Sequence, residues 1–286
     1  MQTLNWPTEN ATSSSTFAQW SHDSSNIILD FHGDPLTAKL VVYSDGNHHM
    51  ALQESAQAFL KLNPAVEDVF YVTTPPNVII NALKSGGFSI GNLQLSIKPD
   101  VFISPNRVMD KLVEDNYCSQ YLPFIKSRGC VALVEKGNPY EIQVIKDLMK
   151  QDVCLFMSNP ETESMSHQVY MNYLANAGLT QTDIDSIKIL YGSKIHHREV
   201  PQAIVDEKAN VAIVYNHLAL RYCRIFPELF EIIEILPLDD ERNPSTEYSI
   251  ASINTGEKFS KAFFQFMKQP QVEEIYKSHG LRSLNP

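Results

Sequence analysis

Short apolar runs alternate with amphipathic segments along most of this chain. The run Leu40–Tyr43 precedes residues 48–62, where Leu52, Ala56 and Phe59 recur at helical spacing. Further strands are predicted at residues 69–72, 100–104, 130–134, 153–157, 187–191, 211–215, 232–236 and 247–253. Further helices are predicted at residues 78–84, 107–114, 142–149, 167–177, 200–207 and 258–276. Strands that alternate with helices in this way predict an α/β fold with parallel sheets.

Length and charge narrow the class of protein. A chain of 286 residues is about twice the usual domain size, so two lobes are expected. Residues 1–37 contain several breaker signals around one apolar run at 27–29, which predicts an extension that packs on the main body. The net charge of -10 argues against a nucleic-acid partner, which needs clustered lysine and arginine.

Cysteine spacing and hydropathy exclude other classes. The four cysteines form no Cys-x-x-Cys pair, so neither a zinc motif nor a redox motif is predicted, and they are expected to be small buried residues. No stretch reaches the roughly 18 apolar residues of a membrane span, and no leader is visible at the start. A periplasmic location is expected if a leader has been removed, and a cytoplasmic one if Met1 is the native start.

Two histidine pairs follow predicted strands. His48 and His49 come soon after the strand at 40–43, and His196 and His197 come after the strand at 187–191. Open α/β sheets gather their ligands where a strand ends and a helix begins. Because neutral imidazole is a common ligand of divalent ions, the pairs indicate a metal or another small ligand. The alternative is that each pair is a solvated part of a loop.

Several short motifs follow one another as they do in a known family. They are residues 40–54, 100–104 with 109–112, 131–139, 159–162, 211–215 and 263–280. In this order they resemble the molybdate-type periplasmic solute-binding proteins of ABC transporters. The resemblance covers about residues 39–281. It implies the two-lobed type II periplasmic-binding-protein fold, in which two crossing strands form a hinge.

The resemblance also implies a division of the chain. Lobe one would comprise residues 38–128 plus 249–286, and lobe two residues 129–248. The crossings would lie near residues 130–134 and 247–253. It further implies a monomer that hands a small inorganic ligand to an ABC permease, with no catalysis. In agreement with this, the sequence contains no nucleotide-binding, serine-hydrolase or zinc-protease motif.

The ligand loops depart from the family pattern. Oxyanion binders use a serine in each of the first two loops, but here Asn47 and Pro76 occupy those places, and Pro76 has no donor. Tyr215, at the end of a strand of lobe two, does match the family tyrosine. Thr74 in the second loop and the helix start at Ser164 are further candidates for binding the ligand.

These substitutions favour a divalent metal as the ligand and leave an oxyanion or small organic acid as the alternative. A divalent metal, zinc or iron above all, could be held by histidines and carboxylates. The candidate metal ligands are His48, His49, Glu163, His196, His197 and Glu199. An oxyanion or small organic acid could instead accept from protonated histidines and from helix N-termini. Metal affinity should then fall below about pH 6.5, whereas anion affinity should rise.

Other histidines receive weaker assignments. His167 and His217 are further candidates for the site, and His217 could equally be a solvated residue at a helix start. His22, His32 and His279 are expected to lie outside the cleft.

Overall fold

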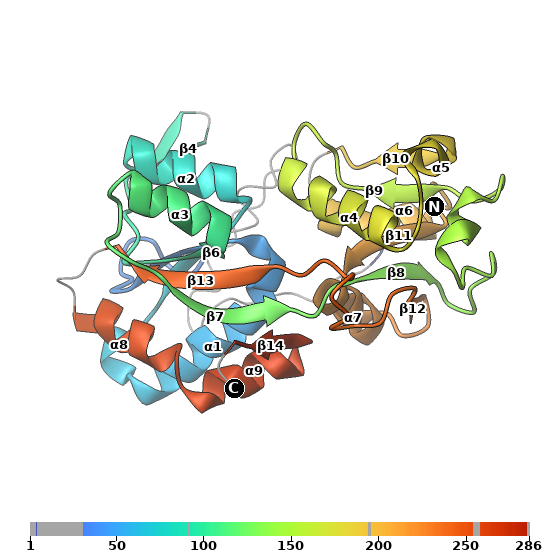
Figure 1. Cartoon of the computed structure of the whole chain (residues 1–286). Coiled ribbons are helices and arrows are strands. Elements are labelled where there is room, and N and C mark those ends of the chain that lie inside the picture. The colour runs from blue at the N-terminus through green and yellow to red at the C-terminus, as the bar shows by residue number, and fades with distance from the viewer. Residues whose placement is uncertain (1–3, 5–30, 91, 194–195, 254–257, 285–286) are drawn as a thin grey trace. The chain divides into compact units, whose positions relative to one another are not determined.

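The chain divides into two compact units, which Figure 1 shows in a computed structural model that describes residues 4, 31–90, 92–193, 196–253 and 258–284. Unit 1 comprises residues 1–8 and 127–246, and unit 2 comprises residues 9–126 and 247–286. The chain thus passes from unit 2 into unit 1 after Lys126 and returns after Thr246. Residues 130–134, where the sequence predicts the first crossing, belong to a strand of unit 1. The apolar run at 27–29 lies outside the described residues.

A seven-stranded sheet forms the centre of unit 2, in the order β1-β3-β2-β6-β13-β7-β14. Its strands are β1 (Phe31–His32), β2 (Val41–Ser44), β3 (Phe70–Thr73), β6 (Val101–Pro105), β7 (Leu122–Ser127), β13 (Glu247–Ser252) and β14 (Leu281–Ser283). Strands β3, β2 and β6 are parallel, whereas β1 and β13 run antiparallel to their neighbours. The predicted parallel strands are thus present, and the strand β13, which follows the inserted unit in the sequence, pairs antiparallel with β6 and β7.

Helices cover both faces of this sheet. They are α1 (His49–Leu62), α2 (Pro76–Ser85), α3 (Asn106–Glu114), α8 (Lys258–Phe266) and α9 (Pro270–Ser278), with short turns η2 (Gly46–His48) and η3 (Pro64–Val66). Figure 1 shows α1, α8 and α9 on one face and α2 and α3 on the other, beside the hairpin β4 (Phe88–Ile90) and β5 (Leu93–Leu95). The single helix predicted at 258–276 is two helices because Pro270 lacks the N–H that a continuous helix needs.

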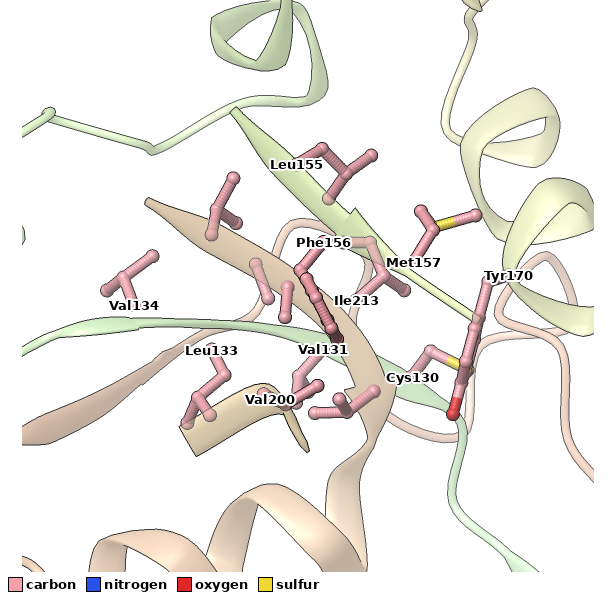
Figure 2. Packing of buried hydrophobic residues seen from close by; sticks show 14 of the residues in the cluster. Cys130, Val131, Leu133, Val134, Leu155, Phe156, Met157, Tyr170, Val200 and Ile213 are labelled. Carbon is pink, nitrogen blue, oxygen red and sulfur yellow. The ribbon is translucent and has the colours of Figure 1, made fainter. Parts of the chain in front are cut away.

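A five-stranded sheet forms the centre of unit 1, in the order β10-β9-β11-β8-β12. Its strands are β8 (Cys130–Glu135), β9 (Leu155–Met157), β10 (Ile189–Tyr191), β11 (Val211–Tyr215) and β12 (Phe230–Ile233). Strands β10, β9 and β11 are parallel, and β8 is antiparallel to β11 and β12. Figure 2 shows how the apolar side chains of β8, β9 and β11 pack with Tyr170 and Val200.

The helices of unit 1 are α4 (Ser164–Asn176), α5 (Gln181–Ser186), α6 (His196–Val205) and α7 (Asn216–Ile225). The helix predicted at 142–149 is a short 3-10 turn, η4 (Ile145–Met149). The Asp147 carboxylate accepts the N–H groups of Gln143 and Val144 at the start of this turn. Leu4 packs into the core of this unit, and its N–H donates to Oε1 of Gln202 on α6. Three of the four cysteines are buried and none forms a disulfide.

Candidate functional site

Three polar side chains lie in a row at the carboxyl edge of the unit 2 sheet. Ser44 at the end of β2 is in register with Thr73 of β3 and with Ile103 of β6. The next residues of these three strands are Asp45, Thr74 and Ser104, and the Asp45 N–H donates to the Ile103 carbonyl at 2.9 Å. Because side chains at one level of neighbouring strands project to the same face, the three belong to one face of the sheet.

Unit 1 has a corresponding carboxyl edge. Ser158 directly follows β9, Asn216 directly follows β11, and α6 begins at His196 shortly after β10. These three strands are parallel, so their carboxyl ends lie at the same edge of the sheet. Helices α6 and α7 begin at this edge, and the first N–H groups of a helix are left without partners in that helix.

Five buried side chains at these two edges have a polar atom with no hydrogen-bond partner among the described residues. They are Thr74 Oγ1, Ser104 Oγ, Ser158 Oγ, His196 Nδ1 and Asn216 Nδ2. None of the five side chains is more than 2% exposed. Buried polar groups are almost always paired, so five such atoms at the edges where α/β sheets hold their ligands indicate a binding role.

His48 is part of the core of unit 2. Its side chain is fully buried, with Nε2 3.3 Å from Ser44 Oγ and Nδ1 3.1 Å from the Tyr276 hydroxyl. The imidazole also lies edge-on to the ring of Tyr248. The alternative of a solvated loop is therefore wrong for this histidine, and both its ring nitrogens already have partners.

The first loop of unit 2 is organised around Asp45. Its Oδ1 accepts the N–H of Asn47 at 2.8 Å, which caps the turn η2. His49 is the first residue of α1, and its Nδ1 donates to the Gly46 carbonyl at 2.9 Å. Burial lowers the pKa of His49. Asn47 and His49 thus shape the loop by local bonds.

His196 is buried between aromatic rings of unit 1. Its imidazole stacks on Phe156 and contacts Tyr170. Nε2 lies 3.4 Å from the Phe156 carbonyl oxygen, which can only accept, so Nε2 carries the proton and Nδ1 presents a lone pair. Burial lowers the pKa of His196 to about 3, and the backbone N–H of His196 donates to Oε2 of Glu163.

The remaining candidates of that loop make local contacts. His197 is half-buried, and its carbonyl accepts the Tyr222 hydroxyl. The Glu199 carboxylate accepts both the N–H and the hydroxyl of Ser193, at 2.7 and 2.6 Å. Glu163 and Glu199 therefore both accept hydrogen bonds from the backbone at the start of α6.

Tyr215 lies at the end of β11 and is 3% exposed. Its hydroxyl is 2.9 Å from Thr246 Oγ1, and its ring stacks on His217, which is buried rather than solvated. Pro76 and Ser164 are the first residues of α2 and α4, as the sequence predicts for helix starts that face a ligand. Whether either contributes to binding stays a prediction.

His167, a further candidate for the site, and the histidines expected outside the cleft have partners of their own. His32 stacks on Tyr71, and its Nε2 lies 2.9 Å from Thr73 Oγ1. His167 Nδ1 donates to the Ser158 carbonyl at 2.9 Å, and His279 pairs with Glu54. His22 lies outside the described residues.

The metal ligands predicted from the sequence are divided between the units. His48 and His49 belong to unit 2, whereas Glu163, His196, His197 and Glu199 belong to unit 1. Within the part of the chain that the structure describes, no three His, Cys, Asp or Glu side chains gather as a metal site. The predicted metal set stays a prediction.

The pKa of His196 changes the expected pH dependence. An imidazole with a pKa of about 3 stays neutral at any pH near neutrality. Protonation of His196 therefore cannot weaken metal binding or strengthen anion binding near pH 6.5. The predicted fall in metal affinity and rise in anion affinity below pH 6.5 both assume an ordinary histidine pKa. Neither applies to His196, because burial disfavours its charged form.

Sequence reasoning missed four of the residues at the two edges: Asp45, Ser104, Ser158 and Asn216. Each stands at the end of a buried apolar run, in the segments VVYSD, DVFIS, LFMS and VAIVYN. The position alone could have found them, because ligands of α/β sheets bind at strand ends. The sequence-based prediction favoured histidines instead, because imidazole is a more specific indicator of a metal site than a hydroxyl or an amide.

Comparison with known proteins agrees with this architecture. Residues 40–282 match the family of bacterial extracellular solute-binding proteins, and the chain belongs to that family. The resemblance to molybdate-type solute-binding proteins of ABC transporters is confirmed at the level of family and fold. Members of the family are solute-binding proteins of transporters, in agreement with the expectation of a binding protein without catalysis. A sequence search of curated proteins finds no match.

Solved structures share the type II periplasmic-binding-protein fold. The periplasmic molybdate-binding protein of Azotobacter vinelandii has a TM-score of 0.64 at 16% identity, covering 86% of this chain and 99% of that chain. PEB3 of Campylobacter jejuni with bound L-phospholactate has a TM-score of 0.62 at 15% identity, covering 85% and 99%. Iron-bound HitA of Pseudomonas aeruginosa has a TM-score of 0.59 at 12% identity, covering 84% and 83%.

None of the described helices is both long enough and apolar enough to span a membrane.

Proposed function

We propose that this chain is the solute-capturing component of an ABC transporter and that its ligand is a small anion, either an oxyanion or a small organic acid. The observation that carries the proposal is the set of buried, unpaired donors at the two carboxyl edges. These donors are four neutral hydroxyl or amide groups with no hydrogen-bond partner among the described residues, and they belong to Thr74, Ser104, Ser158 and Asn216. A monomer that delivers the anion to a membrane permease completes the proposal.

Neutral donors suit an anion better than a cation. A hydroxyl or amide N–H points its positive end at an anion, and a hydrogen bond at a buried position is electrostatically stronger than one in water. Helices α2, α3, α6 and α7 begin at the same edges, and helix N-termini favour negative charge. The molybdate bound by one structural neighbour and the L-phospholactate bound by another are ligands of this chemical kind.

A divalent metal is the second candidate. His196 favours it, because its Nδ1 presents a buried lone pair with no partner among the described residues. Iron-bound HitA shares the fold, so an iron or zinc ligand is compatible with the architecture. Against it, no three His, Cys, Asp or Glu side chains gather as a metal site within the described residues.

Isothermal calorimetry with chelator-stripped protein tests the proposal. We expect molybdate, inorganic phosphate or L-phospholactate to bind with heat that saturates, and zinc and ferric iron to give none. Thr74→Val in unit 2 and Ser158→Ala in unit 1 each remove one unpaired hydroxyl. Each variant should lower the affinity for the anion by ~10-fold.

Ser186→Ala is the matched control for Ser158→Ala, since the Ser186 hydroxyl only donates to the Asp183 carbonyl on an exposed turn. Zinc or iron binding that His196→Ala abolishes, with no anion binding in the wild type, would replace the proposal with the metal candidate.

A further inference from the structure

Asp45 occupies the centre of the polar row of unit 2. Strand β2 lies between β3 and β6 in the sheet, so Asp45 is flanked by Thr74 on one side and Ser104 on the other. The backbone of Asp45 is still extended, which keeps its side chain in the alternation of β2. A ligand that engages the unpaired hydroxyls of this row therefore lies beside a carboxyl group.

The Asp45 carboxyl is buried and has capacity for another donor. It is 3% exposed, and Asn47 is the residue that donates to it through both backbone and side chain. A carboxylate has about four acceptor positions, so two donors leave room for more. Burial raises the pKa of Asp45 to about 6, so the group is mainly ionised above neutral pH.

A carboxylate at an anion site discriminates between anions. A fully deprotonated oxyanion offers Asp45 only acceptor oxygens, and like charges at short range repel. A hydrogenphosphate or a hydroxy acid offers an O–H, which converts that repulsion into a charge-assisted hydrogen bond. A site built around a hydrogen bond rejects an analogue that lacks the partner far more strongly than an apolar site rejects a change of size.

Unit 1 supplies a second buried acceptor. The Phe156 carbonyl fixes the proton of His196 on Nε2, so Nδ1 can accept but cannot donate. A ligand with acceptor oxygens alone would leave this nitrogen unsatisfied. Each unit therefore combines neutral donors with one buried acceptor at its carboxyl edge.

We infer that the captured anion carries a hydrogen-bond donor of its own, as hydrogenphosphate groups and hydroxy acids do, and that Asp45 is the specificity-determining residue that accepts it. The inference rests on the proposed function, because it names the class of anion. It excludes sulfate and molybdate as the preferred ligands of this chain.

Phosphate and sulfate form a matched pair of probes. At about pH 8 both are tetrahedral dianions, and phosphate keeps one proton that sulfate lacks. Calorimetry on the wild-type protein should give phosphate at least ~10-fold tighter binding than sulfate. Glycolate against acetate forms the second pair, and a preference confined to that pair would assign the donor to a hydroxy acid.

The variant Asp45→Asn sharpens the test. Asparagine keeps an oxygen for the Asn47 N–H but replaces the other acceptor with a donor, so sulfate binding should strengthen and the phosphate preference should fall by ~10-fold or more. Asp68→Asn is the matched control. Asp68 is equally buried, but it accepts the N–H groups of Asp34 and Val69 just before β3 begins, away from the carboxyl edge.

The outcomes separate the inference from the proposed function. If anions bind but the wild type does not favour the member that carries the O–H, or if Asp45→Asn leaves the ratio unchanged while folded, the inference is overturned and the proposed function stands. If no anion binds at all, the proposed function fails and the inference with it. Because the wild-type ratio needs no variant, a misfolded Asp45→Asn still leaves a decisive result.

Discussion

The two histidine pairs look alike in sequence and differ in chemical state. Each pair follows a strand and leads into a helix. Both ring nitrogens of His48 have a hydrogen-bond partner, whereas Nδ1 of His196 has none among the described residues. The difference comes from residues far away in sequence. Tyr276, 228 positions from His48, supplies the second partner in unit 2, and no described residue does the same for His196. A strand end therefore locates candidate residues, but the remote packing decides which remain able to bind.

The second histidine of each pair shows the same contrast on a smaller scale. The His49 ring donates to the carbonyl of Gly46 three residues earlier, so it stabilises its own loop. His197 instead offers its carbonyl to Tyr222 on α7. The side chains of the first pair thus hydrogen-bond within unit 2. In the second pair, Nδ1 of His196 has no partner among the described residues and can bind a ligand.

The largest expected effect is on folding and comes from His48→Ala. Removing a fully buried ring opens a cavity and leaves the Tyr276 hydroxyl without a bond, so the free energy of unfolding should fall by about 3 kcal/mol. His197→Ala, at a half-buried position, should cost ~1 kcal/mol. Urea denaturation measures both. A His48→Ala protein of unchanged stability that no longer binds its solute would make His48 a ligand after all.

A second effect depends on pH and concerns His196. Its pKa is about 3 in the folded protein and 6.5 in the unfolded chain, so below pH 6.5 the unfolded chain takes up a proton that the folded protein does not. The stability contributed by the neutral ring is complete above pH 6.5 and is lost as the pH falls toward 3. Between pH 6.5 and about pH 4 this amounts to about 3 kcal/mol.

Denaturation of wild type and His196→Gln across that range isolates the contribution, because His32 also has a pKa of about 3 and titrates in both proteins. His279→Gln, which alters the histidine paired with Glu54, is the control. Identical pH profiles for wild type and His196→Gln would show that the ring of His196 is protonated in the folded state.

The smallest expected effect concerns Glu199. If its carboxylate only accepts from Ser193, Glu199→Gln should lower the free energy of unfolding by ~1 kcal/mol and leave ligand affinity unchanged. Thermal denaturation and calorimetry on the same preparation measure the two quantities. Loss of zinc or iron binding in this variant would support the metal candidate instead.

The sequence predicts the repeating pattern of the fold well, and β11 has the bounds predicted from its apolar run. Buried parallel strands are readable because hydrophobic periodicity is local. Strand β1 was missed because two residues carry no period, and its pairing with β3 depends on a segment far along the chain. The hydrogen bonding of the site histidines could not be predicted for the same reason. The partners of His48 and His196 come from other elements, such as Tyr276 and Phe156.

The chain order of the two units has a consequence for synthesis. Unit 1 is almost wholly the continuous segment 127–246, whereas the sheet of unit 2 has β13, from the other side of that segment, between β6 and β7. A nascent chain can therefore complete the fold of unit 1 before β13, which lies between β6 and β7 in the unit 2 sheet, has left the ribosome. We expect residues 9–126 to remain incompletely folded, with Val101–Pro105 lacking its neighbour β13, until residues 247–286 emerge.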